Sequence, residues 1–157
     1  VIEARLELVL LTNRRIFVGL CGNFADSQDD ILTGSTDTLT LSAESDLCGF
    51  FFDSALSESV KWYMPYNGGT TTGETDASEV VSSVTPVITE FDIVRLEVDP
   101  DGTARWFING NLEQTVSGAI STSVVFSAMV GAIYNSSAAA TLDADYFYVS
   151  ANRDWTK

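Results

Sequence analysis

Two pairs of carboxylates have a spacing that could support acid–base chemistry. Glu90 and Asp92 are separated by one residue, and so are Glu44 and Asp46. On a β-strand, residues two positions apart point to the same face, and glycoside hydrolysis with retention of configuration needs two carboxylates about 5.5 Å apart. These pairs are therefore the candidates for a hydrolytic site. We favour the alternative that they are solvated carboxylates at strand ends.

Other catalytic and metal-binding arrangements have little support in the sequence. The chain has no histidine, which excludes the ordinary Ser-His-Asp and Cys-His arrangements and, with only two cysteines, a structural zinc site. Cys21 and Cys48 lie in apolar stretches, so we expect buried free thiols, with a disulfide as the alternative. Asp26, Asp29 and Asp30 share a loop and are the candidate calcium ligands, because hard cations prefer several oxygens on a flexible segment. We nevertheless expect no required metal and no cofactor.

Aromatic residues beside a glycine-rich loop form a candidate carbohydrate site. Trp62, Tyr63 and Tyr66 precede Asn67 and the glycines that follow it. An exposed ring close to amide groups is a workable platform for a saccharide. On a strand, Trp62 and Tyr66 share one face and Tyr63 lies on the other. We therefore expect one set to belong to the core, with Trp62 in it, and only one set to be available to a ligand.

The elements that must position these side chains are short β-strands. Apolar and charged residues alternate through 91–98, which predicts a strand with one buried face. A turn follows, and 103–109 resumes the alternation with Trp106 on the buried side. Asn109 and Gly110 then predict a tight hairpin, because a type I′ turn needs two residues with positive φ.

The same reasoning predicts an all-β fold without helices. Many short strands with Gly, Ser, Thr, Asp and Asn between them favour a two-sheet antiparallel β-sandwich, formed as a single domain over residues 1–157. The stretch 124–133 is apolar on both faces, so we expect it at the centre of a sheet that is covered on both sides. Further strands are expected near 2–11, 15–22, 38–42, 47–53, 60–66, 79–85, 112–117 and 140–150.

The net charge of the chain limits the classes of molecule that it is expected to bind. The sequence has 8 Lys and Arg residues against 22 Asp and Glu residues, a formal net charge of −14. So negative a surface repels phosphate backbones, and nucleic-acid binding is not expected. No apolar run is long enough to cross a bilayer, so we expect no membrane partner either. Because the chain opens within a strand pattern, we expect that residues precede Val1 in the full protein.

Several segments resemble concanavalin A-like jelly-roll domains, and in particular those of structural proteins in tailed bacteriophages. They are the stretch 91–116, the later strand LDADYFYVS, and the earlier segments IFVGLCG, DLCGFFFD and VKWYMPY. The resemblance spans about 2–150 and implies a jelly-roll fold. It also implies a non-enzymatic virion structural protein, a capsid decoration or head-fibre component on the particle exterior, whose partners are capsid or other virion proteins.

The resemblance leaves two other functions open. One is a carbohydrate-binding, lectin-like module of a phage fibre or of a secreted, extracellular protein, which would bind surface glycans. The other is a glucanase-like hydrolase, since some jelly rolls of this kind carry the strand motif Glu-x-Asp-x-x-Glu. Both acidic pairs here lack the final glutamate, because Arg95 takes its place after Glu90 and Gly49 after Glu44. We therefore expect no enzymatic activity.

An apolar second face on two of the expected strands predicts association. Isolated domains rarely leave such a patch in water, so we expect a homo-oligomer or a capsid-bound protein, with coverage by the chain's own loops as the alternative. The candidate interface residues are Val9, Leu11, Val125, Met129 and Ile133.

Overall fold

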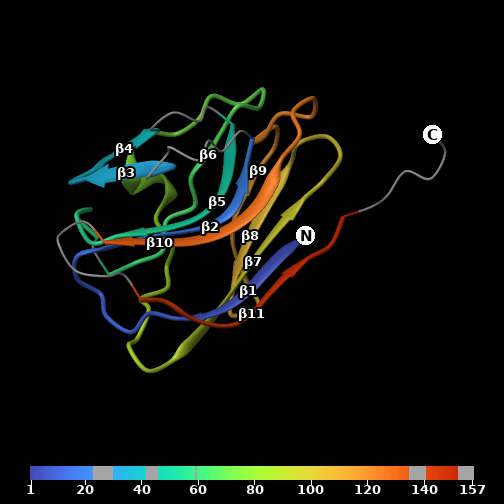
Figure 1. The fold of residues 1–157 in the computed structure, drawn as a ribbon. Coiled ribbons are helices and arrows are strands. Elements are labelled where there is room, and N and C mark those ends of the chain that lie inside the picture. Colours follow the sequence, from blue (N-terminus) through green and yellow to red (C-terminus); the bar gives the residue numbers. More distant parts are fainter. Residues whose placement is uncertain (23–29, 42–45, 59, 135–140, 152–157) are drawn as a thin grey trace.

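The strands of the computed structural model form two sheets and a separate hairpin (Figure 1). The structure describes residues 1–22, 30–41, 46–58, 60–134 and 141–151. Sheet A contains β1 (Ile2–Glu7), β7 (Phe91–Val98), β8 (Ala104–Ile108), β9 (Asn111–Val116) and β11 (Asp143–Val149). Sheet B contains β2 (Arg14–Cys21), β5 (Leu47–Asp53), β6 (Tyr66–Asn67) and β10 (Ser127–Tyr134). The hairpin is formed by β3 (Leu32–Ser35) and β4 (Thr38–Leu41), and a short 3-10 helix, η1, spans Ala77–Val80.

The two sheets pack face to face as the layers of a sandwich (Figure 1). Sheet A has the strand order β11-β1-β7-β8-β9 and sheet B the order β10-β2-β5-β6, and neighbouring strands are antiparallel throughout. This confirms the predicted all-β, two-sheet antiparallel sandwich. Within the described residues, no helix is long and apolar enough to span a membrane.

The main core lies between the sheets and contains both of the tryptophans that the sequence placed there. Trp106 on β8 and Trp62 are fully buried. The Trp62 ring packs edge-on against Phe50 and Phe52 of β5. Its indole N–H donates to the Asp92 carboxylate at 3.0 Å, so a polar group of the ring is satisfied within the core.

A second apolar cluster covers the outer face of sheet B. Every residue of β5 is buried, because its alternate side chains point into two different cores. Phe51 and Phe17 point outward, where the β3–β4 hairpin and η1 pack over them. The hairpin contributes Leu32 and Leu39 to this outer core. Sheet B is therefore covered on both faces, whereas much of the outer face of sheet A carries charged side chains.

The predicted hairpin at Asn109 and Gly110 is confirmed. Both residues have positive φ, 51° and 82°, and they join β8 to β9. The Asn109 side chain accepts a hydrogen bond from Ile93 N at 2.8 Å and donates one to Asp92 at 2.9 Å. These bonds tie the turn to β7, so the asparagine does more than tolerate the left-handed conformation.

Four expectations about the strands differ from the structure. The stretch 124–133 is not central: β10 begins only at Ser127 and is an edge strand of sheet B, although both of its faces pack against apolar clusters. Within 60–66, Tyr63 forms isolated bridges and Tyr66 begins β6, so the segment is not one regular strand, and 79–85 holds the end of η1. Strand β3 lies in a stretch where we expected no strand, because four residues around a glycine carry too little periodicity.

Both cysteines are buried thiols that form no disulfide, as expected. Cys21 belongs to the outer core and Cys48 to the core between the sheets, so they lie on opposite faces of sheet B. Two side chains on opposite faces cannot form a disulfide without moving the backbone. Burial raises the pKa of the Cys48 thiol well above its ordinary value, which keeps it protonated and unreactive.

Candidate functional site

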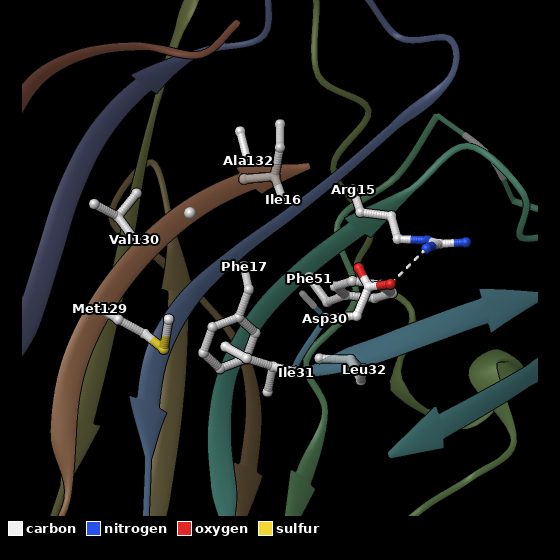
Figure 2. A pocket seen from close by; sticks show the side chains of 11 residues that line it. Arg15, Ile16, Phe17, Asp30, Ile31, Leu32, Phe51, Met129, Val130 and Ala132 are labelled. Atoms are coloured by element: carbon white, nitrogen blue, oxygen red, sulfur yellow. Dashed lines mark hydrogen bonds and ion pairs between the residues drawn. The ribbon is translucent and has the colours of Figure 1, made fainter. Parts of the chain in front are cut away.

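A pocket of about 330 Å³ lies on the outer face of sheet B, beside the β3–β4 hairpin (Figure 2). It lies between β10 and the start of the hairpin, since both contribute lining residues. Its floor comes from Phe17 on β2, Phe51 on β5 and Met129 on β10, and Ile31 and Leu32 form one wall. The lining is therefore almost wholly apolar.

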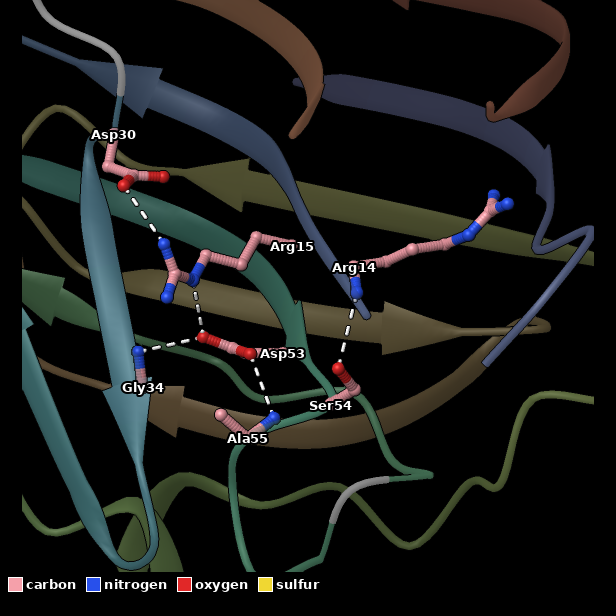
Figure 3. Close-up of polar contacts among 7 residues, drawn as sticks. All are labelled: Arg14, Arg15, Asp30, Gly34, Asp53, Ser54 and Ala55. Atoms are coloured by element: carbon pink, nitrogen blue, oxygen red, sulfur yellow. Dashed lines mark hydrogen bonds and ion pairs between the residues drawn. The ribbon is translucent and has the colours of Figure 1, made fainter. Parts of the chain in front are cut away.

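The polar end of the pocket is a network around Arg15 (Figure 3). The Arg15 Nε donates to Asp53 at 2.8 Å, and Nη1 donates to Asp30 at 3.0 Å. Asp53 is fully buried at the end of β5 and also accepts hydrogen bonds from the backbone N–H groups of Gly34 and Ala55, both at 2.9 Å. Asp53 thus joins β2, β5 and the hairpin, and it fixes the orientation of the guanidinium.

The two carboxylates keep the Arg15 guanidinium charged. Partial burial lowers the pKa of Arg15, but hydrogen bonding and attraction to Asp53, and then to Asp30, raise it by more, so the net shift is upward. The cation is therefore a permanent feature of the pocket. It serves first to neutralise a buried carboxylate, since Asp53 has no other cation within ion-pair distance among the described residues.

One carboxylate oxygen of Asp30, at the polar end of the pocket, accepts no hydrogen bond from the described residues. Asp30 uses Oδ2 for Arg15, while its Oδ1 is buried and accepts no hydrogen bond within the described part of the chain. This oxygen has almost no accessible surface, so it is not presented to a ligand. The pocket is thus shaped for an apolar group. Among the described residues that line the pocket, Arg15 and Asp30 are the ionisable ones, and they are paired with each other.

The aromatic residues proposed for carbohydrate binding do not form a platform. Trp62 and Tyr63 are both buried, on opposite faces of their segment, so the expectation that one set faces a ligand is wrong for these two rings. The cause is the double covering of sheet B. Tyr66 is half-buried against Trp106, with ring centroids 6.1 Å apart, and Asn67 is also half-buried. The hollow beside them holds about 10 Å³, room for a water molecule but not for a sugar.

The structure describes three of the four carboxylates of the acidic pairs, and Glu90 and Asp92 differ in their exposure. Asp92 is buried, and its two oxygens accept from Trp62 Nε1 and Asn109 Nδ2, which corrects the expectation that it is solvated. Glu90 is exposed just before β7. Asp46 is half-buried, and Glu44 lies outside the described residues.

Of the three candidate calcium ligands, the structure describes one, Asp30. Asp26 and Asp29 lie outside the described residues, and Asp30 is ion-paired with Arg15. Across the described ranges, three or more Asp, Glu, His or Cys side chains nowhere gather in a way that could hold a metal ion.

The five predicted interface residues do not form one surface. Leu11 packs against the core between the sheets, whereas Met129 packs against the outer core and lines the pocket. Val9 is half-buried, and Val125 is 86% exposed just before β10. Ile133 pairs with Arg15 in the register of β10 and β2, but its side chain lies outside the described part of the structure.

The most exposed apolar strand was not selected from the sequence. Tyr146, Phe147, Tyr148 and Val149 on β11 are 36%, 37%, 54% and 48% exposed. Among the described strands, β11 has β1 as its single neighbour. Beside it, a cleft of about 580 Å³ opens between the sheets, with Ile2, Leu96 and Phe126 among its lining residues. Four consecutive large apolar residues were a usable signal, since a strand with one wet face should alternate.

Comparisons of the chain with known protein families, with characterised proteins and with solved structures found no match, so the site is interpreted from its own geometry.

Proposed function

We propose that this chain is a non-enzymatic structural protein of a bacteriophage particle, a capsid decoration or head-fibre component on the exterior of the virion. The observation that carries the proposal is the apolar edge at β11, where four large side chains are exposed beside the cleft between the sheets. Folded domains that work alone seldom leave such a patch in water, whereas proteins that assemble use patches of this kind as interfaces. The virion context comes from the resemblance of the strand sequences to phage structural domains.

The chemistry of the described polar groups supports a binding role. The buried carboxylates Asp53 and Asp92 have their oxygens engaged by N–H donors of the chain itself, so they stabilise the fold. The pocket on sheet B has one ion pair and an apolar lining. A hydrolase would instead need two carboxylates free to exchange protons with a substrate.

The charge of the chain supports a position on the outside of a particle. A domain with a formal net charge of −14 is repelled by packaged nucleic acid, and it remains soluble when it projects into water. Its partners are then capsid or other virion proteins, and copies of the domain can associate on the shell.

Location in the particle tests this function. An antibody against the chain should label intact, gradient-purified phage particles in electron micrographs, and the chain should sediment with capsids after the tails are removed. A reconstruction of the particle should show the sandwich on the outer surface. Recovery of the chain only from the soluble fraction of the lysate, with unlabelled particles, would contradict the proposal.

A further inference from the structure

The backbone of β11 presents hydrogen-bonding groups on its outer edge. Val1 N donates to Ser150 O at 2.7 Å and Ser150 N donates to Val1 O at 2.9 Å, so these residues form a hydrogen-bonded pair. Antiparallel ladders alternate such pairs with pairs that are not hydrogen-bonded. The N–H and C=O groups of Val149 and Phe147 therefore point away from β1. On that side the structure describes no neighbouring strand.

The side chains of this edge leave the core partly open. Val149 lies opposite Ile2 and Phe147 lies opposite Ala4, so both share the face that is buried in the core between the sheets. Val149 lines the cleft of about 580 Å³. A strand added beyond β11 would place every second side chain over this cleft and cover the two half-exposed residues.

Regular pairing is restricted to the second half of β11. The register between β1 and β11 shifts between Arg5 and Leu6, which places an extra residue, Asp145, in β11. Bulges of this kind interrupt an edge and limit how much of it another strand can use. The regular stretch is Tyr146–Val149, which includes both residues with outward-facing backbone groups.

The charges around the edge favour a basic partner. The outer face of β1 and β11 carries four carboxylates, those of Glu3, Glu7, Asp143 and Asp145. Two cations lie among or beside them: Arg5 pairs with Asp145, and Arg95 of β7 lies opposite Glu3. Glu7 and Asp143 lie directly opposite each other as like charges. A second copy docked through β11 would bring these same carboxylates together, and each copy carries a net charge of −14. Basic side chains on the added strand would relieve this repulsion.

We propose that β11 is a docking edge for a short extended segment of a different protein, in which apolar residues alternate with basic ones. The segment pairs with Tyr146–Val149 as a further antiparallel strand of sheet A. Its apolar side chains cover the cleft, and its basic side chains lie near Glu3, Asp143 and Asp145. This inference rests on the proposed function, because it specifies how the domain holds its neighbour.

A titration of the wild-type chain with a synthetic peptide of alternating valine and lysine tests the proposal. We expect the amide resonances of Phe147 and Val149 to shift and their hydrogen exchange to slow. The amides of β9, the other edge of sheet A, are the internal control and should not respond. The same peptide with lysine replaced by glutamate should bind more weakly. A peptide with N-methylated valines, which cannot donate to the edge, should not bind.

Two variants at one position separate backbone pairing from side-chain burial. Val149→Pro removes an N–H that points away from β1, so the pairing with β1 should persist. Val149→Ala keeps that N–H and removes most of the side chain. We expect Val149→Pro to weaken peptide binding about fivefold or more, the factor that corresponds to one lost hydrogen bond, and Val149→Ala to have a smaller effect. If Val149→Pro does not fold, the N-methylated peptide on the wild-type chain gives the same test.

Several outcomes would overturn the inference. Shifts on β9 instead of β11, equal binding of the glutamate peptide, or unchanged binding to Val149→Pro would each do so. A wild-type dimer in light scattering that becomes a monomer in Val149→Pro would identify a second copy as the occupant. If phage particles retain the Val149→Pro chain, the inference fails and the virion function stands. If the peptide binds at β11 but the chain is absent from particles, the virion function fails and the docking edge stands.

Discussion

Replacement of Trp106 tests how the two sheets are joined. Gly49 N donates to Pro65 O at 3.1 Å, so Gly49 of β5 faces Pro65 in the continued register of β5 and β6. Proline has no N–H, and the Gly49 carbonyl on that side of the ladder therefore has no backbone donor. The indole N–H of Trp106 reaches across from sheet A and donates to this carbonyl at 2.7 Å.

These contacts set the expected loss in the free energy of unfolding for each substitution. Trp106→Ala removes a fully buried ring and should lower the free energy of unfolding by about 3–5 kcal/mol. Trp106→Phe keeps an aromatic ring but leaves the buried Gly49 carbonyl without a donor, which should cost about 1–3 kcal/mol. In a Pro65→Ala background the chain regains an N–H opposite Gly49. The cost of Trp106→Phe should then be smaller by about 1 kcal/mol.

The assay is urea unfolding followed by far-ultraviolet circular dichroism, for the wild type, the three single variants and the Trp106→Phe/Pro65→Ala double variant. Unchanged m-values would show that the comparison is between similar folded and unfolded states. Additive costs of the two substitutions would refute the argument that the indole replaces the missing proline donor. A loss below about 1 kcal/mol for Trp106→Ala would refute the placement of this ring in the core.

Three further predictions concern other parts of the chain. In urea unfolding, Gly110→Val should lower the free energy of unfolding by about 1 kcal/mol through its positive φ alone, since a Cβ there meets no atom within 4 Å. Gly110→Asn should cost less in the same assay, because asparagine tolerates positive φ. In urea unfolding, Asp53→Ala should lower the free energy of unfolding by about 3 kcal/mol, because it leaves a largely buried Arg15 and two backbone N–H groups without their acceptor. Asp30→Ala should lower it by about 1 kcal/mol or less, because the Asp30 side chain is more exposed than that of Asp53. Incubation with β-glucans should release no reducing sugar, and turnover that Glu90→Gln abolishes would overturn the non-enzymatic proposal.

The parts of the fold that were predictable are those fixed by local physics. Alternation in 91–98 and 103–109 sets which face is buried, and the Asn109–Gly110 turn sets their register, so β7, β8 and β9 were located from sequence to within a residue. Trp106 was placed in the core by the same alternation. No distant segment had to be known for these assignments.

The candidate site was less predictable because distant segments create it. Trp62 and Tyr63 alternate as a strand does, yet both are buried because the β3–β4 hairpin and η1 return over the outer face of sheet B. The pairing of Arg15 with Asp53 joins residues 38 positions apart in the chain. Nothing in the local pattern around either residue indicates the other, since a charge in a strand is more often solvated than paired.

The same argument explains why the position of β10 was predicted wrongly and why the apolar residues of β11 were overlooked. An apolar residue on both faces signals that both faces meet something other than water, but the sequence does not reveal what. In β10, residues such as Met129 and Val130 pack against two cores of the chain itself, and an edge position proved compatible with covering on both sides. In β11, Tyr146–Val149 meet no comparable cover in the described structure. Both strands lie at the edge of a sheet and both are apolar on two faces, so neither the local pattern nor the strand order distinguishes them; the packing of the other segments does.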